Sequence, residues 1–169
     1  HGRHIKGLSF ILDSLSRELD ILFIVSSGNV TGGQKNGLEW KEEYPAFLED
    51  DEWAIIEPAP AINAITVGSL ARYDKTINSQ RYPTDPDEIP IALHNQPSPF
   101  TRRGYSIGGA IKPDLMAYGG NWALNTRAGA NFLVLNCGLG ELSTCREFTS
   151  GKMLASENGT SMAAPQVAH

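Results

Sequence analysis

The chain begins with apolar residues at helical spacing, and an unbroken apolar run follows them directly. The run is Ile21–Val25, and the helically spaced residues are Leu8, Ile11, Leu12, Leu15 and Leu19. Positions spaced i, i+3, i+4, i+7 and i+11 lie on one side of an α-helix, which predicts an amphipathic helix. A strand without polar alternation is typical of a parallel sheet covered on both faces. A helix leading straight into such a strand predicts an α/β fold.

Two further apolar runs, Ala64–Val67 and Phe132–Leu135, predict additional short strands, because turn-forming residues bound each of them. Two long irregular stretches, residues 30–61 and 75–104, separate the predicted strands, and we interpret both as surface loops. A chain of 169 residues with 41% hydrophobic content is long and apolar enough for one buried core. We therefore expect residues 1–169 to belong to a single domain.

The first of these stretches is strongly acidic. Residues 39–57 contain eight carboxylates and one base, Lys41. A run of like charge usually forms a solvated surface, and an acidic rim that prefers basic substrates or holds calcium is the alternative. The spacing of the acids does not match an EF-hand loop, so we assign no metal site. The second stretch carries five of the ten prolines, which favours an extended excursion over a strand.

Charge and hydropathy exclude two classes of partner. The net charge is −5, and no basic stripe with interleaved aromatic residues occurs, so a nucleic-acid partner is not expected. No apolar run approaches the roughly 18 residues of a membrane span, and the first residues lack a signal-peptide pattern. These features leave the cellular location open.

The segment Gly159–Pro165 has the composition expected around a nucleophilic serine. Gly159 allows backbone conformations closed to other residues, while Ala163 and Ala164 keep bulk away from the Ser161 hydroxyl. A helix that begins here also favours developing negative charge at its N-terminus. The alternative for Ser161 is a helix N-cap without a catalytic role.

Together with three other segments, this motif resembles the subtilisin-like serine proteases. The other segments follow the order found in that family and are Ser26–Asn29, Asn63–Ser69 and Lys112–Ala117. The resemblance implies a three-layer α/β fold with a mostly parallel sheet and helices on both faces. It also implies that the chain is an incomplete catalytic domain, running from the strand before the oxyanion asparagine to the serine helix.

The resemblance further implies a role for each matching residue. Ser161 would be the nucleophile of a serine endopeptidase and Asn29 the donor to the oxyanion. The other matching positions would contact the polypeptide substrate and are Ser26, Ser27, Gly28, Gly159 and Thr160. No cofactor is implied, and calcium remains an option of the family for which we identify no site. The alternative for Asn29 is a plain turn residue after a strand.

The base of the reaction is harder to place. The start of the chain, His1–Gly7, matches the form of the family's histidine motif, which would make His1 the base. However, the interval from His1 to Asn29 is already filled by one helix and one strand, whereas the family places further elements there. We therefore expect the catalytic histidine and aspartate in a preceding part of the same protein, and the chain alone to be nearly inert.

Other interpretations stay open. An α/β-hydrolase elbow would require an apolar strand before Gly159, but the polar residues Ser156–Asn158 precede it. A non-catalytic remnant that binds peptides is the second alternative. Cys137 and Cys145 could form a local disulfide, although two separate thiols are the more cautious interpretation. Apolar faces left exposed by an incomplete sheet would favour self-association.

Overall fold

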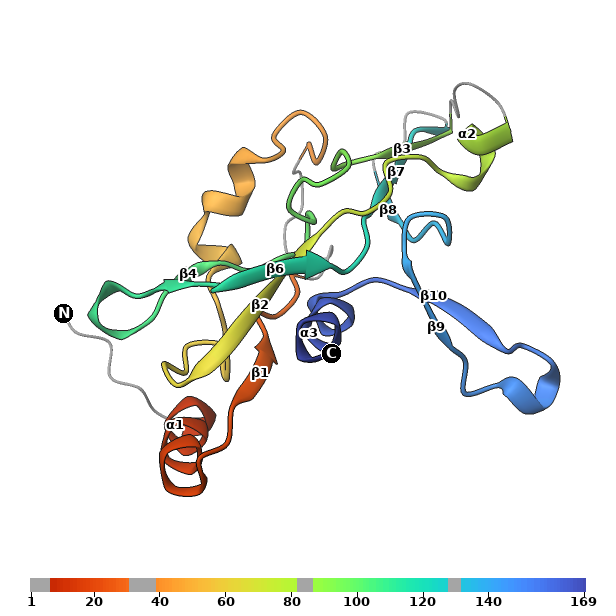
Figure 1. Cartoon of the computed structure of the whole chain (residues 1–169). Coiled ribbons are helices and arrows are strands. Elements are labelled where there is room, and N and C mark those ends of the chain that lie inside the picture. The colour runs from red at the N-terminus through yellow and green to blue at the C-terminus, as the bar shows by residue number, and fades with distance from the viewer. Residues whose placement is uncertain (1–6, 31–38, 82–86, 128–131) are drawn as a thin grey trace.

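The structure, a computed structural model, describes residues 7–30, 39–81, 87–127 and 132–169 (Figure 1). The helices are α1 (Gly7–Leu19), α2 (Ile77–Arg81) and α3 (Thr160–Ala168), with short 3-10 turns η1 (Ala46–Glu49), η2 (Asp51–Trp53), η3 (Ile107–Gly109) and η5 (Phe148–Ser150). The strands are β1 (Phe23–Ser26), β2 (Ala64–Leu70), β3 (Glu88–Pro90), β4 (Gly104–Tyr105), β5 (Ile111–Lys112), β6 (Leu115–Tyr118), β7 (Ala123–Asn125), β8 (Phe132–Val134), β9 (Glu141–Thr144) and β10 (Leu154–Glu157). The chain thus folds as a mixed α/β structure.

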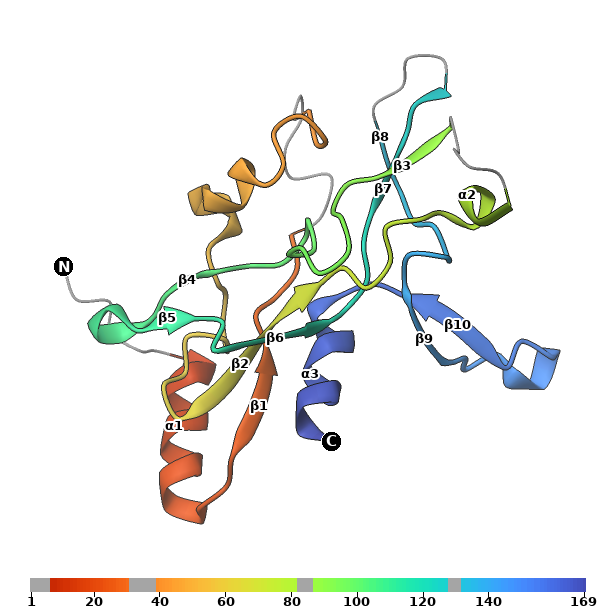
Figure 2. The same ribbon diagram turned by 45° about the horizontal axis from the view of Figure 1, so that its top comes forward.

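A small parallel sheet with strand order β1-β2-β6 lies at the centre. Phe23 is in register with Ala64, and Val67 is in register with Leu115. The middle strand β2 is almost entirely buried, as expected for an apolar strand with neighbours on both sides. Helix α3 packs against all three strands (Figure 2). The predicted parallel pairing is therefore confirmed for this sheet.

Parallel pairing is confined to that sheet among the described strands. The predicted strand at Phe132–Leu135 forms as β8, but it belongs to an antiparallel sheet of order β3-β7-β8. Two antiparallel pairs, β4 with β5 and β9 with β10, complete the described strands. The expectation of a mostly parallel sheet therefore applies only to the central sheet.

Helix α1 confirms the predicted amphipathic helix, and its attachment is polar. The carboxylate of Asp13 accepts hydrogen bonds from the backbone N–H groups of Ile62 and Asn63, at 3.1 and 2.7 Å, just before β2. Leu8 and Ile11, on the apolar side of the helix, are 56% and 50% exposed. Leu12 and Leu15 on the same side are half-buried, so the described residues cover the apolar side only in part and polar contacts contribute to holding the helix.

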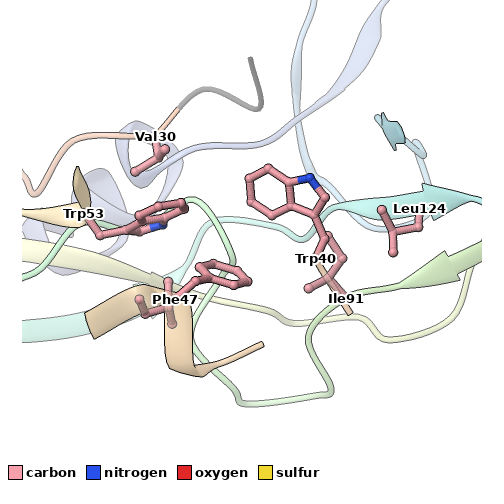
Figure 3. Close-up of a cluster of buried hydrophobic side chains, with 7 residues drawn as sticks. Val30, Trp40, Phe47, Trp53, Ile91 and Leu124 are labelled. Atoms are coloured by element: carbon pink, nitrogen blue, oxygen red, sulfur yellow. The ribbon is translucent and has the colours of Figure 1, made fainter. Parts of the chain in front are cut away.

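The acidic stretch is more ordered than a solvated loop. All its acids are exposed, as expected, but Trp40, Phe47 and Trp53 are buried and pack edge to face or tilted against one another (Figure 3). We call the buried group the aromatic cluster; its members are Val30, Trp40, Phe47, Leu48, Trp53, Ile91 and Leu124. The surface-loop interpretation is therefore right for the carboxylates and wrong for the aromatic residues.

The proline-rich stretch likewise contains regular structure. Glu88–Pro90 forms β3, which contradicts the expectation that no strand occurs here. Because β3 is at the edge of its sheet, Pro90 fits there without removing a ladder hydrogen bond between neighbours. Ile91 and Phe100 from the same stretch are buried. Prolines 83 and 86 lie outside the described residues.

The segment Lys112–Asp114, just before β6, bonds to the middle strand β2 of the central sheet. The buried Lys112 ammonium donates to Ala64 O at 2.9 Å and to Asp114 Oδ2 at 2.6 Å, and Asp114 Oδ2 also accepts from Thr66 N. This motif therefore has a structural role. No helix in the described part of the chain is both long and apolar enough to span a membrane.

Candidate active site

Asn29 and the first turn of α3 meet beyond the end of β1. Asn29 Oδ1 accepts hydrogen bonds from Thr160 N at 2.9 Å and from Thr160 Oγ1 at 3.0 Å. Gly159 is the N-cap residue and has no side chain to cap α3. The side-chain oxygen Oδ1 of Asn29 accepts from a helix N–H group in its place. With Oδ1 engaged, Nδ2 is the free end of the amide, and it donates to no other described residue.

Gly159 lies between the Asn29 amide and the Ser161 hydroxyl. A Cβ atom at Gly159 would stand 3.0 Å from Asn29 Nδ2 and 3.1 Å from Ser161 Oγ. Nδ2 and Oγ are therefore at most about 6 Å apart, the sum of those two distances. Gly159 is itself fixed, because its N–H donates to Gly119 O at 2.8 Å. Only glycine leaves the space between the two groups empty.

Ser161 is exposed and is the second residue of α3. Its hydroxyl makes no hydrogen bond with any described residue, and the N-cap position is occupied by Gly159. The N-cap interpretation of Ser161 therefore does not fit this geometry. Ala163, one position beyond Met162, is fully buried against the sheet, which leaves Ser161 on the opposite, open side.

The segment before Asn29 is only partly open. Ser27 is fully buried, its Oγ has no hydrogen-bond partner, and its N–H donates to Val67 O. Ser26 and Gly28 are half-buried. Gly28 has a φ of +94°, and a Cβ there would meet Ile56 Cγ1 at 2.9 Å. Of the three predicted pocket residues, Ser26 and Gly28 are thus the ones that solvent reaches.

Asn29 is not explained by the turn alternative. The positive φ belongs to Gly28, and Asn29 itself forms a β-bridge with Thr101. The next residue, Val30, donates from its N–H to Phe100 O at 2.9 Å and joins the aromatic cluster. The backbone on both sides of Asn29 is therefore paired, while its side chain is exposed.

Neither described histidine, His94 or His169, forms a hydrogen bond with Ser161. His94 Nδ1 lies 2.6 Å from Arg72 O, and its ring stacks on Tyr118 rather than meeting Ser161. His1, the alternative base, lies outside the described residues. The described part of the chain also contains no group of three or more potential metal ligands. Cys137 and Cys145 are free thiols, in agreement with the cautious interpretation.

Sequence reasoning missed two residues beside this site, Ile56 and Arg102. Ile56 belongs to the acidic stretch and lies against Gly28, and Arg102 belongs to the proline-rich stretch and donates to the backbone oxygen of Asn29. Neither belongs to a motif, and both reach the site only through tertiary packing. A local sequence signal could not have identified them.

Comparison with known proteins assigns the family. Residues 5–169 match the Subtilase family. The chain is also 36% identical over 179 residues to "Uncharacterized protein y4bN" of Sinorhizobium fredii, which covers 98% of this chain and 38% of that relative. The chain thus spans about two fifths of the length of this curated relative. No solved structure matches the chain. Because the family match covers nearly every residue, the chain belongs to the subtilase family of serine peptidases.

Proposed function

We propose that this chain carries the nucleophile and the oxyanion donor of a serine endopeptidase. The supporting observation is that Asn29 Nδ2 and Ser161 Oγ both border the empty space beside Gly159. A carbonyl placed in that space would expose its carbon to Ser161 and its oxygen to Asn29. Subtilase membership supports peptide-bond hydrolysis as the reaction.

In the proposed reaction, Ser161 Oγ forms a bond with the carbonyl carbon, and the carbonyl oxygen becomes an oxyanion. Asn29 Nδ2 donates to that oxygen, and the N-terminus of α3 adds a favourable field. The serine proton passes to an imidazole base and then to the leaving amine. We place that base in the same protein but outside the described residues, because no described histidine bonds to Ser161.

The same proposal assigns substrate contacts. An extended polypeptide would approach along Ser26 and Gly28, with Ile56 as an apolar wall for the side chain before the cleaved bond. Gly159 would border the reacting carbonyl, whereas Thr160, also predicted to contact substrate, is fully buried and instead holds Asn29 Oδ1. For the complete domain we retain the three-layer arrangement as a prediction. A peptide-binding remnant that does not cleave is the alternative, and the absence of a described base is what favours it.

Labelling of the full-length protein with a fluorophosphonate tests the proposal. We expect the protein to be labelled, Ser161→Ala to remain unlabelled, and Ser150→Ala, a serine in the exposed turn η5, to be labelled as the unaltered protein is. Peptidase turnover of Ser161→Ala should fall by about 10⁶-fold, the loss known for the nucleophile of a subtilisin.

Two results would contradict the proposal. Labelling that persists in Ser161→Ala would show that the nucleophile is another residue. A folded parent protein that binds peptides but is not labelled would support the alternative of a peptide-binding remnant that does not cleave. In a separate preparation of residues 1–169, we expect little labelling. Strong labelling lost in His1→Ala would instead identify His1 as the base.

A further inference from the structure

A buried arginine links Asn29 to two neighbouring backbone carbonyls. Arg102 is 7% exposed, and its Nε donates to Asn29 O at 3.0 Å. Its Nη1 donates to Glu52 O at 2.7 Å and to Ala54 O at 2.9 Å. One guanidinium therefore ties the asparagine to the η2 turn of the acidic stretch.

Arg102 is a buried cation, so its guanidinium depends on the hydrogen bonds that it donates. No carboxylate in the described part of the chain forms an ion pair with it, and burial lowers its pKa. A buried cation is unfavourable unless hydrogen-bond acceptors surround it. The three carbonyls supply those acceptors, and bonds from a charged donor are stronger than neutral ones. The carbonyl of Asn29 is thus held more firmly than an ordinary loop carbonyl.

Arg102 also restrains the residue before the asparagine. Its backbone N–H donates to Gly28 O at 3.3 Å, and a Cβ at Gly28 would stand 3.1 Å from Arg102 Cδ. Gly28 has a positive φ, so this peptide would otherwise have wide conformational freedom. The backbone and side chain of Arg102 together limit the orientations open to the Gly28–Asn29 peptide.

The side chain of Asn29 is fixed at its other end by Thr160, which donates to Oδ1. With Arg102 holding the backbone oxygen and Thr160 holding Oδ1, the direction of Nδ2 is determined. An oxyanion donor is effective only when it is preorganised at the position where charge develops. A displacement of about 1 Å at a catalytic group can cost about 100-fold in rate.

We propose that Arg102 is a positioning residue for the reaction, acting through Asn29 to aim its amide at the oxyanion. This inference rests on the proposed function. Arg102 touches no reacting atom in this scheme, so its contribution should disappear when the Asn29 amide is removed. It should also be specific to arginine, because one lysine ammonium cannot reproduce the planar Nε and Nη1 donors.

A double-mutant cycle in the full-length protein tests this. Arg102→Lys should lower kcat by about 10- to 100-fold with KM changed less than about twofold. Asn29→Ala should lower kcat by about 100- to 1000-fold. Adding Arg102→Lys to Asn29→Ala should cost less than about twofold more.

The adjacent Arg103 provides the control. Its Nε donates to Leu48 O at 2.7 Å, and it makes no bond with Asn29. Arg103→Lys should therefore change kcat by less than about threefold. Titration of reactive serines with the fluorophosphonate refers each kcat to folded enzyme, so partial misfolding of a variant does not mimic the effect.

The outcomes separate this inference from the proposed function. If Asn29→Ala is slow but Arg102→Lys has normal kcat, or if the two losses multiply in the double mutant, Arg102 is not a positioning residue while the proposed function stands. If Asn29→Ala and Ser161→Ala both retain full turnover, the proposed function falls and this inference falls with it.

Discussion

The region around Ser161 and the aromatic cluster are built in opposite ways. In β2 and α3 the buried apolar side chains are small, as at Ala64, Val67 and Ala163, and hydrogen bonds between α3 and Asn29 set the geometry of the site. The aromatic cluster instead contains two buried tryptophans, Trp40 and Trp53. Small residues let backbones approach closely, whereas large rings bury more apolar surface. Hydrogen bonds fix the positions of the groups around Ser161, whereas the buried rings of the aromatic cluster stabilise the fold.

The two regions meet at the residue after the asparagine. Val30 belongs to the aromatic cluster and bonds to Phe100 O, while Asn29 carries the site. Phe100 in turn packs on Trp122, with ring centroids 5.2 Å apart. The acidic stretch lies outside the parallel sheet, yet its buried aromatic residues share a cluster with Val30, the residue next to Asn29, and so support the site.

The largest effect should follow from truncation of the aromatic cluster. Trp53 is fully buried, and its Nε1 donates to Pro99 O at 3.1 Å. Trp53→Ala should lower the free energy of unfolding by about 3–5 kcal/mol, because it leaves a cavity and an unpaired carbonyl. Denaturant unfolding measures this, and Trp53→Phe, which retains a ring, should lose less. A loss below about 1 kcal/mol for the alanine variant would show that the cluster is not the stabilising region.

A substitution at the site should have the reverse effect and lower activity more than stability. In Gly159→Ala the new methyl group would occupy the space between Asn29 Nδ2 and Ser161 Oγ. We expect kcat to fall by about 100-fold or more, comparable to the loss of one oxyanion donor. Steady-state kinetics and thermal unfolding of the same samples would measure both quantities.

Gly151 offers the matched control. It has a φ of +87° and open space around its Cα, so Gly151→Ala strains the backbone without touching the site. It should cost about 1 kcal/mol of stability and leave kcat unchanged. If Gly159→Ala instead kept full activity, the space beside Gly159 would not be the place where the substrate carbonyl binds.

The same contrast explains what could be predicted from the sequence. Helix α1, strands β1 and β2 and the start of α3 follow from local periodicity and motifs, and they were predicted to within a few residues. The aromatic cluster was missed because its contacts join distant residues such as Trp40 and Trp122. Arg102 was missed for the same reason, since its acceptors are Asn29, Glu52 and Ala54. Local patterns do not encode which loops meet.

The smallest effect concerns a buried carboxylate in β9, which pairs with β10, the strand before α3. Glu141 starts β9, its Oε1 has no hydrogen-bond partner, and Arg72 Nε lies 3.5 Å from its Oε2. Burial raises the pKa of Glu141, and the charge of Arg72 opposes this only in part. Unlike the Asn29 amide, which is exposed, this carboxylate is buried with one oxygen unpaired.

Because the folded-state pKa of Glu141 is raised, the carboxyl favours folding when protonated. Its stabilising contribution is present below the ordinary carboxyl pKa and is lost as the pH rises through the folded value. Glu141→Gln should therefore flatten the pH dependence of the unfolding free energy just above the ordinary carboxyl pKa. Glu147→Gln is the control, since Glu147 and its partner Lys152, 4.0 Å away, are both exposed. If Glu141→Gln and the unaltered protein had the same pH profile, the charge of Arg72 would compensate the buried charge of Glu141 fully.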